Sequence, residues 1–171
     1  CAECPPQLVD LVQAGGATVV TQPGFVFCNG DDYLTRVDSS LLQHLYPVDA
    51  LIQAGVPVAF GSDAPVIDPN PWPAIYSAVT RKTRDGNTLS PDDPSPARGQ
   101  GVPVIEALRM YTIAGAYTEG TEDRKGTIRS GKLADIVLLD ADPTEVSPPR
   151  LKDIRAVMTV LGGRVERGGL N

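Results

Sequence analysis

Metal-binding and disulfide-forming side chains are scarce in this sequence of 171 residues, which has one histidine, His44, and three cysteines. A hydrolytic metal site normally needs two or three imidazole or carboxylate ligands, so histidines of this chain alone cannot build one. Three cysteines without a regular framework argue against a secreted domain held by disulfides, and a cytoplasmic protein is expected. Cys1 and Cys4 have the spacing of zinc and redox motifs, but no second pair follows and Cys28 is isolated. We interpret all three as structural.

Long apolar runs and an excess of basic residues are also missing. No apolar stretch approaches the roughly 18 residues of a membrane span, so no membrane association is expected. The sequence has 15 lysines and arginines against 21 acidic residues, a net charge of −6. A nucleic-acid binder needs a concentrated basic face, so a small molecule is the expected partner. No charged and apolar leader follows the first residue, and we interpret the sequence as a fragment of a longer protein.

The hydrophobic residues, together 42% of the sequence, follow an alternating helix and strand pattern in the first half. The pattern predicts, in order, a helix, a strand, a loop, two helices and a second strand: residues 7–14, 17–21, 22–32, 34–45, 47–54 and 56–60. Both strands are continuously apolar, as in a parallel sheet covered on its two faces. We therefore predict a βαβ unit with the two strands paired in parallel.

The second half of the sequence predicts a different arrangement of elements. A helix is predicted at 74–82, a polar surface excursion of the lid type at 83–100, and a longer helix at 103–117. Strands are predicted at 134–139 and 156–161, and Gly162-Gly163 is a two-residue turn into a further extended segment. This small β unit follows the α/β body.

Asp63 is the main candidate for chemistry. The apolar strand at 56–60 ends in Gly61-Ser62-Asp63, which puts a carboxylate at the carboxyl edge of the sheet. Barrel and open α/β enzymes carry their active sites at this edge. An aspartate in this position can equally cap the turn or helix that follows the strand. Position alone leaves both interpretations open.

Three segments together resemble the carboxyl-terminal half of the amidohydrolase superfamily, in its YtcJ-like (amidohydrolase 3) group. They are GSDAP at 61–65, ALRMYTIAGA at 107–116 and GTIRSGKLADIVLLD at 126–140, in the order of the family. The resemblance implies an α/β fold that is the last part of a (β/α)8 TIM-type barrel with a small β-sandwich. Residues 1–125 would supply the last two barrel strands and helices, and 126–171 part of the composite sandwich.

The resemblance also implies an activity. The chain would be part of a metal-dependent hydrolase of non-peptide carbon–nitrogen bonds, acting on a small amide-like substrate, with Asp63 as metal ligand and proton shuttle. The divalent metal, zinc by expectation and one or two ions, would be held mostly by residues outside this sequence. Alone the chain would be inactive; a homo-oligomer of the full-length protein is left open. The alternatives are a noncatalytic α/β binding or interaction module and a deaminase of the same superfamily.

Other side chains are weaker candidates. Gln22 and Trp72 lie on or near loops at the active edge and are predicted to bind substrate, and Arg81 or Lys82 could also shape the pocket. A packing or solvated role is equally compatible with each of these four. His44 lies in a predicted helix away from the strand ends, so we interpret it as structural.

Further acidic residues are assigned to turns or to solvent. Asp135 and Asp140 flank a strand of the small β unit and are interpreted as turn or cap residues. Two pairs of adjacent acidic residues are present, Asp31-Asp32 and Asp92-Asp93. We interpret both as solvated loop faces, because side chains at neighbouring positions rarely point at one substrate.

Overall fold

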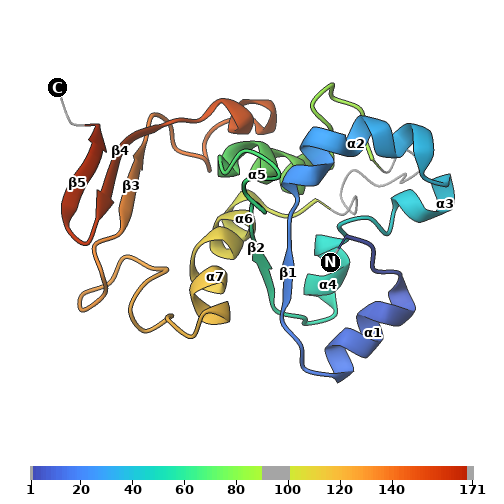
Figure 1. The fold of residues 1–171 in the computed structure, drawn as a ribbon, viewed down its shortest axis with the longest axis horizontal. Coiled ribbons are helices and arrows are strands. Elements are labelled where there is room, and N and C mark those ends of the chain that lie inside the picture. The colour runs from blue at the N-terminus through green and yellow to red at the C-terminus, as the bar shows by residue number, and fades with distance from the viewer. Residues whose placement is uncertain (1, 90–100, 169–171) are drawn as a thin grey trace.

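The computed structural model describes residues 2–89 and 101–168 and has a mixed α/β fold, which confirms the predicted class (Figure 1). The helices are α1 (Pro6–Ala14), α2 (Gly24–Arg36), α3 (Ser39–Leu42), α4 (Val48–Gln53), α5 (Pro71–Thr80), α6 (Val104–Tyr111), α7 (Ile113–Thr118) and the 3-10 helix η1 (Pro148–Asp153). The strands are β1 (Val19–Thr21), β2 (Val58–Phe60), β3 (Ile136–Leu139), β4 (Ala156–Leu161) and β5 (Arg164–Gly168).

Strands β1 and β2 lie side by side in the centre of the molecule and pair in parallel, as predicted (Figure 1). The register sets Thr21 opposite Phe60, and the amide of Gly61 donates to the carbonyl of Thr21 at 3.0 Å. The chain between the strands forms α2, α3 and α4. Both strands therefore end at the same edge, and the residues after them emerge together.

The segment after β1 was predicted as a loop through residue 32, and this is wrong, because it forms the 13-residue helix α2. Asn29 and Gly30 suggest a turn in the sequence, yet they lie in the middle of the helix. A Cβ atom at Gly30 would stand 2.5 Å from Cγ2 of Thr83. Glycine is thus required here by close packing against Thr83, and its effect on helix propensity, about 1 kcal/mol, is overridden by tertiary contacts.

The predicted helix at 103–117 is interrupted at Thr112, which corrects the expectation of one continuous helix. Thr112 has φ −118° and ψ −91°, outside the helical region, and separates α6 from α7. Its hydroxyl donates to the carbonyl of Leu108 at 2.8 Å. Threonine side chains that bond back to the preceding turn in this way commonly bend helices.

The helix predicted at 34–45 is also divided. The short α3 begins after Asp38, whose carboxylate accepts a hydrogen bond from the amide of Ser40.

The main hydrophobic core lies around α5, which packs against α2, α6 and η1, while α6 and α7 pack against β2. Ile75 of α5, Leu51 of α4 and Leu151 of η1 are each at most 1% exposed. Of the three positions expected to face inward in this helix, Ile75 and Ala78 are buried, whereas Val79 is half-buried against the same core. The core thus covers β2 completely but only one face of β1, whose Val20 is 45% exposed, so the expectation of a pair covered on both faces holds for β2 alone.

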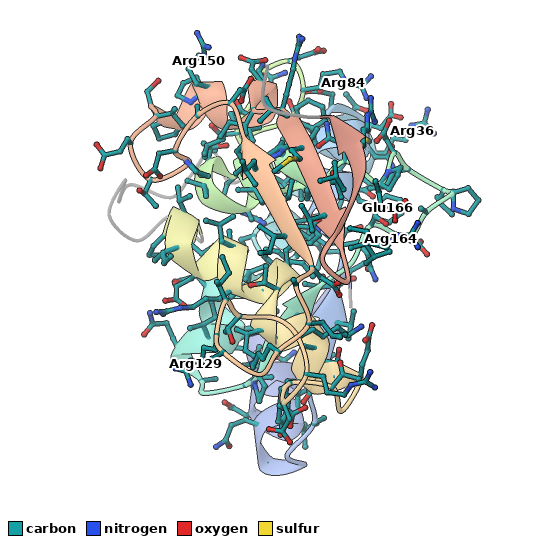
Figure 2. The ribbon with its side chains drawn as sticks, turned by 90° about the vertical axis from the view of Figure 1, so that its left-hand side faces the viewer. Arg36, Arg84, Arg129, Arg150, Arg164 and Glu166 are labelled. Carbon is teal, nitrogen blue, oxygen red and sulfur yellow. The ribbon has the colours of Figure 1, made fainter. Side chains whose placement is uncertain are left out.

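The small sheet lies away from the β1–β2 pair and is antiparallel, in the order β3-β4-β5 (Figure 1). Gly162 and Gly163 join β4 to β5 with φ angles of 55° and 83°, the left-handed conformations that a two-residue hairpin turn needs. The predicted turn is confirmed. Strand β5 is an exposed edge, and Arg164 and Glu166 place charges along it (Figure 2). Charged edge strands are protected against pairing with other chains.

Part of the predicted polar excursion lies outside the described residues, including Asp92 and Asp93, and so does Cys1. At the start of the excursion, Lys82 and Thr88 form an isolated antiparallel bridge. Across residues 2–89 and 101–168, no helix combines the length and the apolar character that crossing a membrane would require.

Candidate active site

Asp63 and Gln22 lie where the two parallel strands end. Gln22 directly follows β1, and Asp63 stands three residues after the end of β2. Because Thr21 and Phe60 are in register, the two segments leave the sheet next to each other. Gln22 is half-buried and Asp63 is exposed. This edge is where parallel α/β proteins bind ligands.

The backbone of Asp63 is held in an unusual conformation. Its φ angle is 58°, in the left-handed region that few residues other than glycine adopt, although aspartate tolerates it better than most. Its carbonyl accepts the amide of Val66 at 2.8 Å, which closes a turn. The helix after this turn, α5, is capped by Asn70, whose side chain accepts the amide of Trp72 at 3.2 Å. The helix-capping role considered for Asp63 therefore belongs to Asn70.

Tyr46 is a buried residue that no sequence pattern marked. Its side chain is 5% exposed, and its hydroxyl oxygen lies 3.4 Å from that of Tyr33. The ring stacks on those of Tyr33 and Phe25, with centroids 6.3 and 6.4 Å away. Burial raises the pKa of Tyr46, the Tyr33 phenol adds to this, and the negative charge of Asp63 raises it further.

Arg81 is buried behind Tyr46. Its side chain is 4% exposed, and its guanidinium donates to the carbonyls of Leu45 and Tyr46, both at 2.9 Å. Burial lowers the pKa of Arg81 to about 10, so the group remains charged at neutral pH. The sequence suggested Arg81 or Lys82 for the pocket; Lys82 is exposed, whereas Arg81 supports the backbone of Tyr46 from the interior.

A cavity of about 180 Å³ adjoins the carboxyl edge. It is bordered by Ser62, the neighbour of Asp63, by Gly24 and Cys28 of α2, and by Arg84. The Arg84 guanidinium lies 5.4 Å from the centroid of the Phe27 ring, a cation–π contact. The volume of the 180 Å³ cavity suits one substituent of a small molecule, since pockets for whole ligands measure about 300 Å³ or more.

The remaining candidates lie in different surroundings. Trp72 is 6% exposed and belongs to the hydrophobic core, and it does not line the 180 Å³ cavity. His44 was expected in a helix but lies in the turn after α3, half-buried, where its carbonyl accepts the amide of Cys4 at 2.9 Å. Asp135 and Asp140, expected in turns or caps, accept the backbone amides of Gly162 and Arg155 respectively, which are contacts between distant segments of the small β unit.

Asp31 was assigned to a solvated loop, and this is wrong, because it is half-buried on α2 and connects α2 to the segment at 83–87. Its Oδ1 accepts the Asn87 amide at 2.8 Å and the Thr83 hydroxyl at 2.7 Å. The Asn87 bond first, and then the Thr83 bond, lower the pKa of Asp31 below its ordinary 3.8. A carboxylate with a lowered pKa stabilises the fold fully above the unfolded-state pKa and loses this contribution as the pH falls through the folded-state pKa.

We expect an Asp31→Asn variant to show a weaker loss of stability on acidification than the unmodified chain. Urea denaturation between about pH 6 and pH 2 measures the unfolding free energy of both proteins. The difference between the two free energies should be smallest below pH 3.8, where Asp31 is increasingly protonated. Asp32→Asn, at the exposed neighbouring position, is the control and should keep the unmodified pH dependence. Parallel curves for the chain and Asp31→Asn would contradict the assignment.

Asp63 could serve as one ligand of a divalent cation, since it offers a solvent-accessible carboxylate at the strand end. Among residues 2–89 and 101–168, no three histidine, cysteine, aspartate or glutamate side chains come together as a metal site would require. Among the described residues, Asp63 therefore offers a single ligand position and not a complete metal site.

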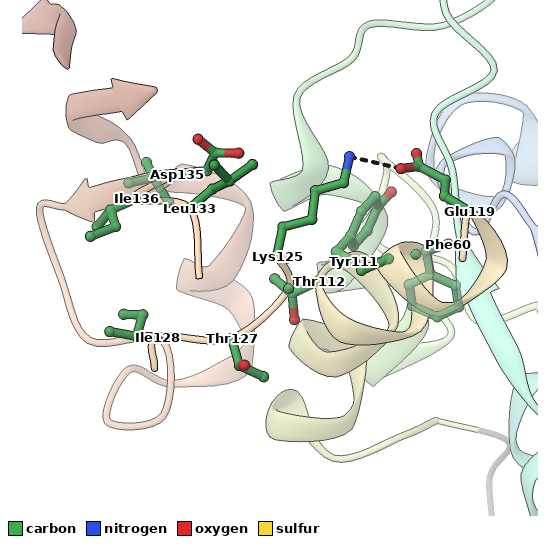
Figure 3. Close-up of a pocket in the computed structure, with 14 residues that line it drawn as sticks. Phe60, Tyr111, Thr112, Glu119, Lys125, Thr127, Ile128, Leu133, Asp135 and Ile136 are labelled. Atoms are coloured by element: carbon green, nitrogen blue, oxygen red, sulfur yellow. Dashed lines mark ion pairs between the residues drawn. The ribbon is translucent and has the colours of Figure 1, made fainter. Parts of the chain in front are cut away.

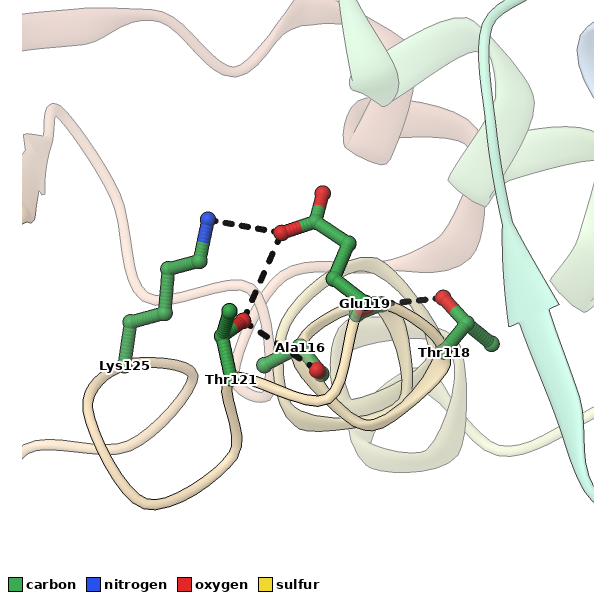
Figure 4. A network of polar contacts seen from close by, with 6 residues as sticks. Ala116, Thr118, Glu119, Thr121 and Lys125 are labelled. Carbon is green, nitrogen blue, oxygen red and sulfur yellow. Dashed lines mark hydrogen bonds and ion pairs between the residues drawn. The ribbon is translucent and has the colours of Figure 1, made fainter.

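A larger cavity, of about 470 Å³, lies between α6–α7 and the loop that leads to β3 (Figure 3). Phe60 lines it from β2, and the Lys125 ammonium reaches across to the Glu119 carboxylate at 2.7 Å. The Thr121 hydroxyl contacts the same carboxylate at 3.4 Å (Figure 4). This exposed ion pair closes one side of the cavity. Asp63 is not among its lining residues, so the candidate active site is the carboxyl edge.

Comparison with known proteins gives relatives over most of the chain. The N-substituted formamide deformylase of Arthrobacter pascens is 34% identical over 157 residues, which cover 90% of this chain and 28% of that protein. YtcJ of Bacillus subtilis (strain 168), whose name marks it as an amidohydrolase, is 31% identical over 144 residues, or 84% of this chain and 26% of YtcJ. The chain therefore spans about a quarter of the length of these relatives.

The fold is also similar to solved structures. An adenosine deaminase from Xanthomonas campestris, solved with bound zinc, aligns with a TM-score of 0.65 and 22% identity over 98% of this chain and 36% of that one. A model of the amidohydrolase family matches residues 2–166, nearly the entire sequence. The resemblance drawn from the three sequence segments is thereby confirmed, and the chain belongs to the amidohydrolase family.

Proposed function

We propose that this chain is the carboxyl-terminal part of a metal-dependent hydrolase that cleaves carbon–nitrogen bonds other than peptide bonds in small molecules. The observation that carries the proposal is Asp63, an exposed carboxylate in a left-handed conformation at the edge where two parallel strands end. Family membership over residues 2–166 supports it. In this proposal β1 and β2 are the last two strands of a (β/α)8 barrel. Residues 1–125 belong to the barrel, and residues 126–171 belong to a composite β-sandwich.

The chemistry follows from the position of the carboxylate. A divalent ion, zinc in this proposal, lowers the pKa of a bound water to about 7 when it is present. Asp63 would be one of the residues that hold the ion, and its carboxylate would take up a proton from the attacking water and return it to the departing nitrogen. Gln22, beside it at the end of β1, binds the substrate. Trp72 is buried in the core at the start of α5 and holds that end of the 61–70 segment in place.

The relatives suggest the substrate class. The Arthrobacter relative is named for N-substituted formamides, and we propose small amides of this kind as substrates. A second candidate is the deamination of an adenosine-like amine, favoured by the structural similarity to the zinc-containing deaminase. Both reactions need a water, a carbonyl-like carbon and a departing nitrogen, so the same carboxylate would serve either.

The test uses the complete gene product that contains this chain. We expect it to release formate from a panel of N-alkyl and N-aryl formamides, to lose this activity after dialysis against a chelator, and to regain it with zinc. Release of ammonia from adenosine without formate release would favour the second candidate. Absence of both reactions, together with absence of bound metal, would contradict the proposal and leave the noncatalytic binding module.

A further inference from the structure

The 180 Å³ cavity is formed by the two segments that leave the strand ends. Gly24 lies two residues after Gln22, Ser62 directly precedes Asp63, and both Gly24 and Ser62 line the cavity. The two segments leave the sheet next to each other, because β1 and β2 are paired in register. Consecutive Cα atoms are about 3.8 Å apart, so the Ser62 wall lies one residue from the candidate carboxylate. A small molecule bound at Asp63 is thus within a few bonds of this cavity.

Small side chains keep the cavity open. Gly24 and Cys28 are four residues apart on α2 and therefore lie on the same face of the helix. Ala74 of α5, which packs against α2, is 3% exposed and also lines the cavity. A Cβ atom at Gly24 would stand 2.5 Å from Cδ1 of Ile67 and 3.5 Å from Cβ of Ala74. Protein interiors leave few voids larger than a water molecule, so a hollow of this volume between contacting elements has room for a ligand group.

The walls favour an uncharged, apolar group. The two charged residues of the lining, Arg84 and Asp68, have opposite signs, and both are exposed to water. The Arg84 guanidinium already lies over an aromatic ring, and the Asp68 carboxylate already accepts the amide of Asn70 at 2.8 Å. A cation and an anion would therefore each meet one like charge in the lining. The apolar side chains of the lining are Phe27, Ile67, Pro73 and Ala74.

The volume sets an upper limit to the size of this group. An apolar cavity of about 150 Å³ in another protein accommodates one benzene ring. A group of two fused rings would have to displace Ile67 or Ala74. Tyr111 cannot give way easily, because its ring packs edge-on against Phe60 of β2, with the centroids 5.4 Å apart. Burial raises the pKa of Tyr111 to about 12, so this wall is also uncharged at neutral pH.

We infer that the 180 Å³ cavity binds the group carried by the departing nitrogen of the substrate, and that this group is uncharged and no larger than about one six-membered ring. Ile67 and Cys28 determine the size limit, from the 61–70 segment and from α2 respectively. A formamide has only hydrogen on its acyl side, so the bulk of such a substrate lies on its nitrogen. This inference rests on the proposed function and extends it to the choice of substrate.

The first test enlarges the cavity with Ile67→Ala in the complete gene product. It compares kcat/KM for N-phenylformamide and N-(2-naphthyl)formamide, whose departing amines differ little in basicity but differ by one ring in size. We expect the unmodified protein to prefer the phenyl compound and Ile67→Ala to shift the ratio about 10-fold or more towards the naphthyl compound. Val66→Ala is the control, since Val66 is 67% exposed and does not line the cavity. A ratio that Ile67→Ala leaves unchanged would contradict the size limit.

The second test fills the cavity with Cys28→Leu. We expect kcat/KM for N-phenylformamide to fall about 10-fold or more, and kcat/KM for N-methylformamide to change much less, because a methyl group needs little of the space. Thr35→Leu, at an exposed position of the same helix, should leave both values within about twofold. Equal losses for the phenyl and methyl compounds in Cys28→Leu would count against the inference.

The third test uses the unmodified protein and does not depend on the stability of a variant. Cys28 is half-buried and lines the cavity, so its reaction with methyl methanethiosulfonate reports whether the cavity is occupied. We expect aniline, the amine that N-phenylformamide releases, to slow this reaction with a saturating dependence on concentration. At the same concentration, 2-naphthylamine should protect Cys28 less. Peptide mass spectrometry separates Cys28 from the buried Cys4.

The outcomes separate this inference from the proposed function. Hydrolysis that depends on Asp63, with the same phenyl-to-naphthyl ratio in every variant and no protection of Cys28, would overturn the inference and leave the proposed function intact. Protection of Cys28 by aniline without hydrolysis of any formamide would contradict the proposed function and support the cavity as the binding site. Absence of both hydrolysis and protection would overturn both.

Discussion

Replacing Asp63 with asparagine is expected to lower the rate of carbon–nitrogen bond hydrolysis by the complete gene product about 100- to 10,000-fold, the range for loss of a general acid–base group. The amide has nearly the shape of the carboxylate but can neither take up a proton from water nor neutralise a cation. The loss should appear mainly in kcat, measured by formate release from the best N-substituted formamide. Zinc content, measured by atomic emission, should fall as well if Asp63 is a ligand.

Asparagine is the informative replacement because of the backbone. Asp63 has a φ of 58°, and asparagine adopts this left-handed region readily, whereas alanine would add roughly 1 kcal/mol of strain or more. The unfolding free energy of Asp63→Asn should therefore stay within about 0.5 kcal/mol of the unmodified chain. Asp32→Asn, at an exposed position on α2, controls for the removal of one negative charge and should keep full activity. Full activity of Asp63→Asn would contradict the proton-shuttle role.

Replacing Arg81 with methionine is expected to have the largest effect on stability, a loss of about 3–5 kcal/mol in the unfolding free energy. The reason is that two hydrogen bonds from a buried charged donor disappear, each worth about 1.5–3 kcal/mol, and the carbonyl of Leu45 is left without its donor in the interior. Out of a total stability of about 5–15 kcal/mol for an ordinary domain, this loss is large. Urea denaturation measures it directly.

The neighbouring position provides a matched control. Lys82→Met removes the same charge from an exposed side chain, and the unfolding free energy should change by less than about 0.5 kcal/mol. Arg81→Lys should lie between the two, since an ammonium can donate to a carbonyl but cannot reproduce the guanidinium fork. Equal stabilities for Arg81→Met and Lys82→Met would contradict the structural role assigned to the buried arginine.

Several elements followed from local patterns of the sequence. The apolar run at 56–60 predicted β2 and its parallel pairing, and Gly61 after that run placed Asp63 beyond the end of a strand. The Gly162-Gly163 pair predicted the hairpin turn. These features depend on residues close in sequence, where periodicity and turn chemistry are sufficient guides. Helix α2 was missed because Gly30 resembles a breaker and is instead required by the approach of Thr83.

The sequence by itself determined the α/β class, the family resemblance and the position of a carboxylate at the carboxyl edge of the sheet. The tertiary structure decided which residues far apart in the sequence contact one another. Arg81 meets the Tyr46 carbonyl across 35 positions of the chain, and no local period encodes which carbonyl a buried guanidinium will bind. The Tyr46 ring stacks on Phe25 and Tyr33 of α2, while Arg81, directly after α5, holds the Tyr46 carbonyl. Such contacts arise only from the packing of several elements at once, so they could not be read from the order of the residues.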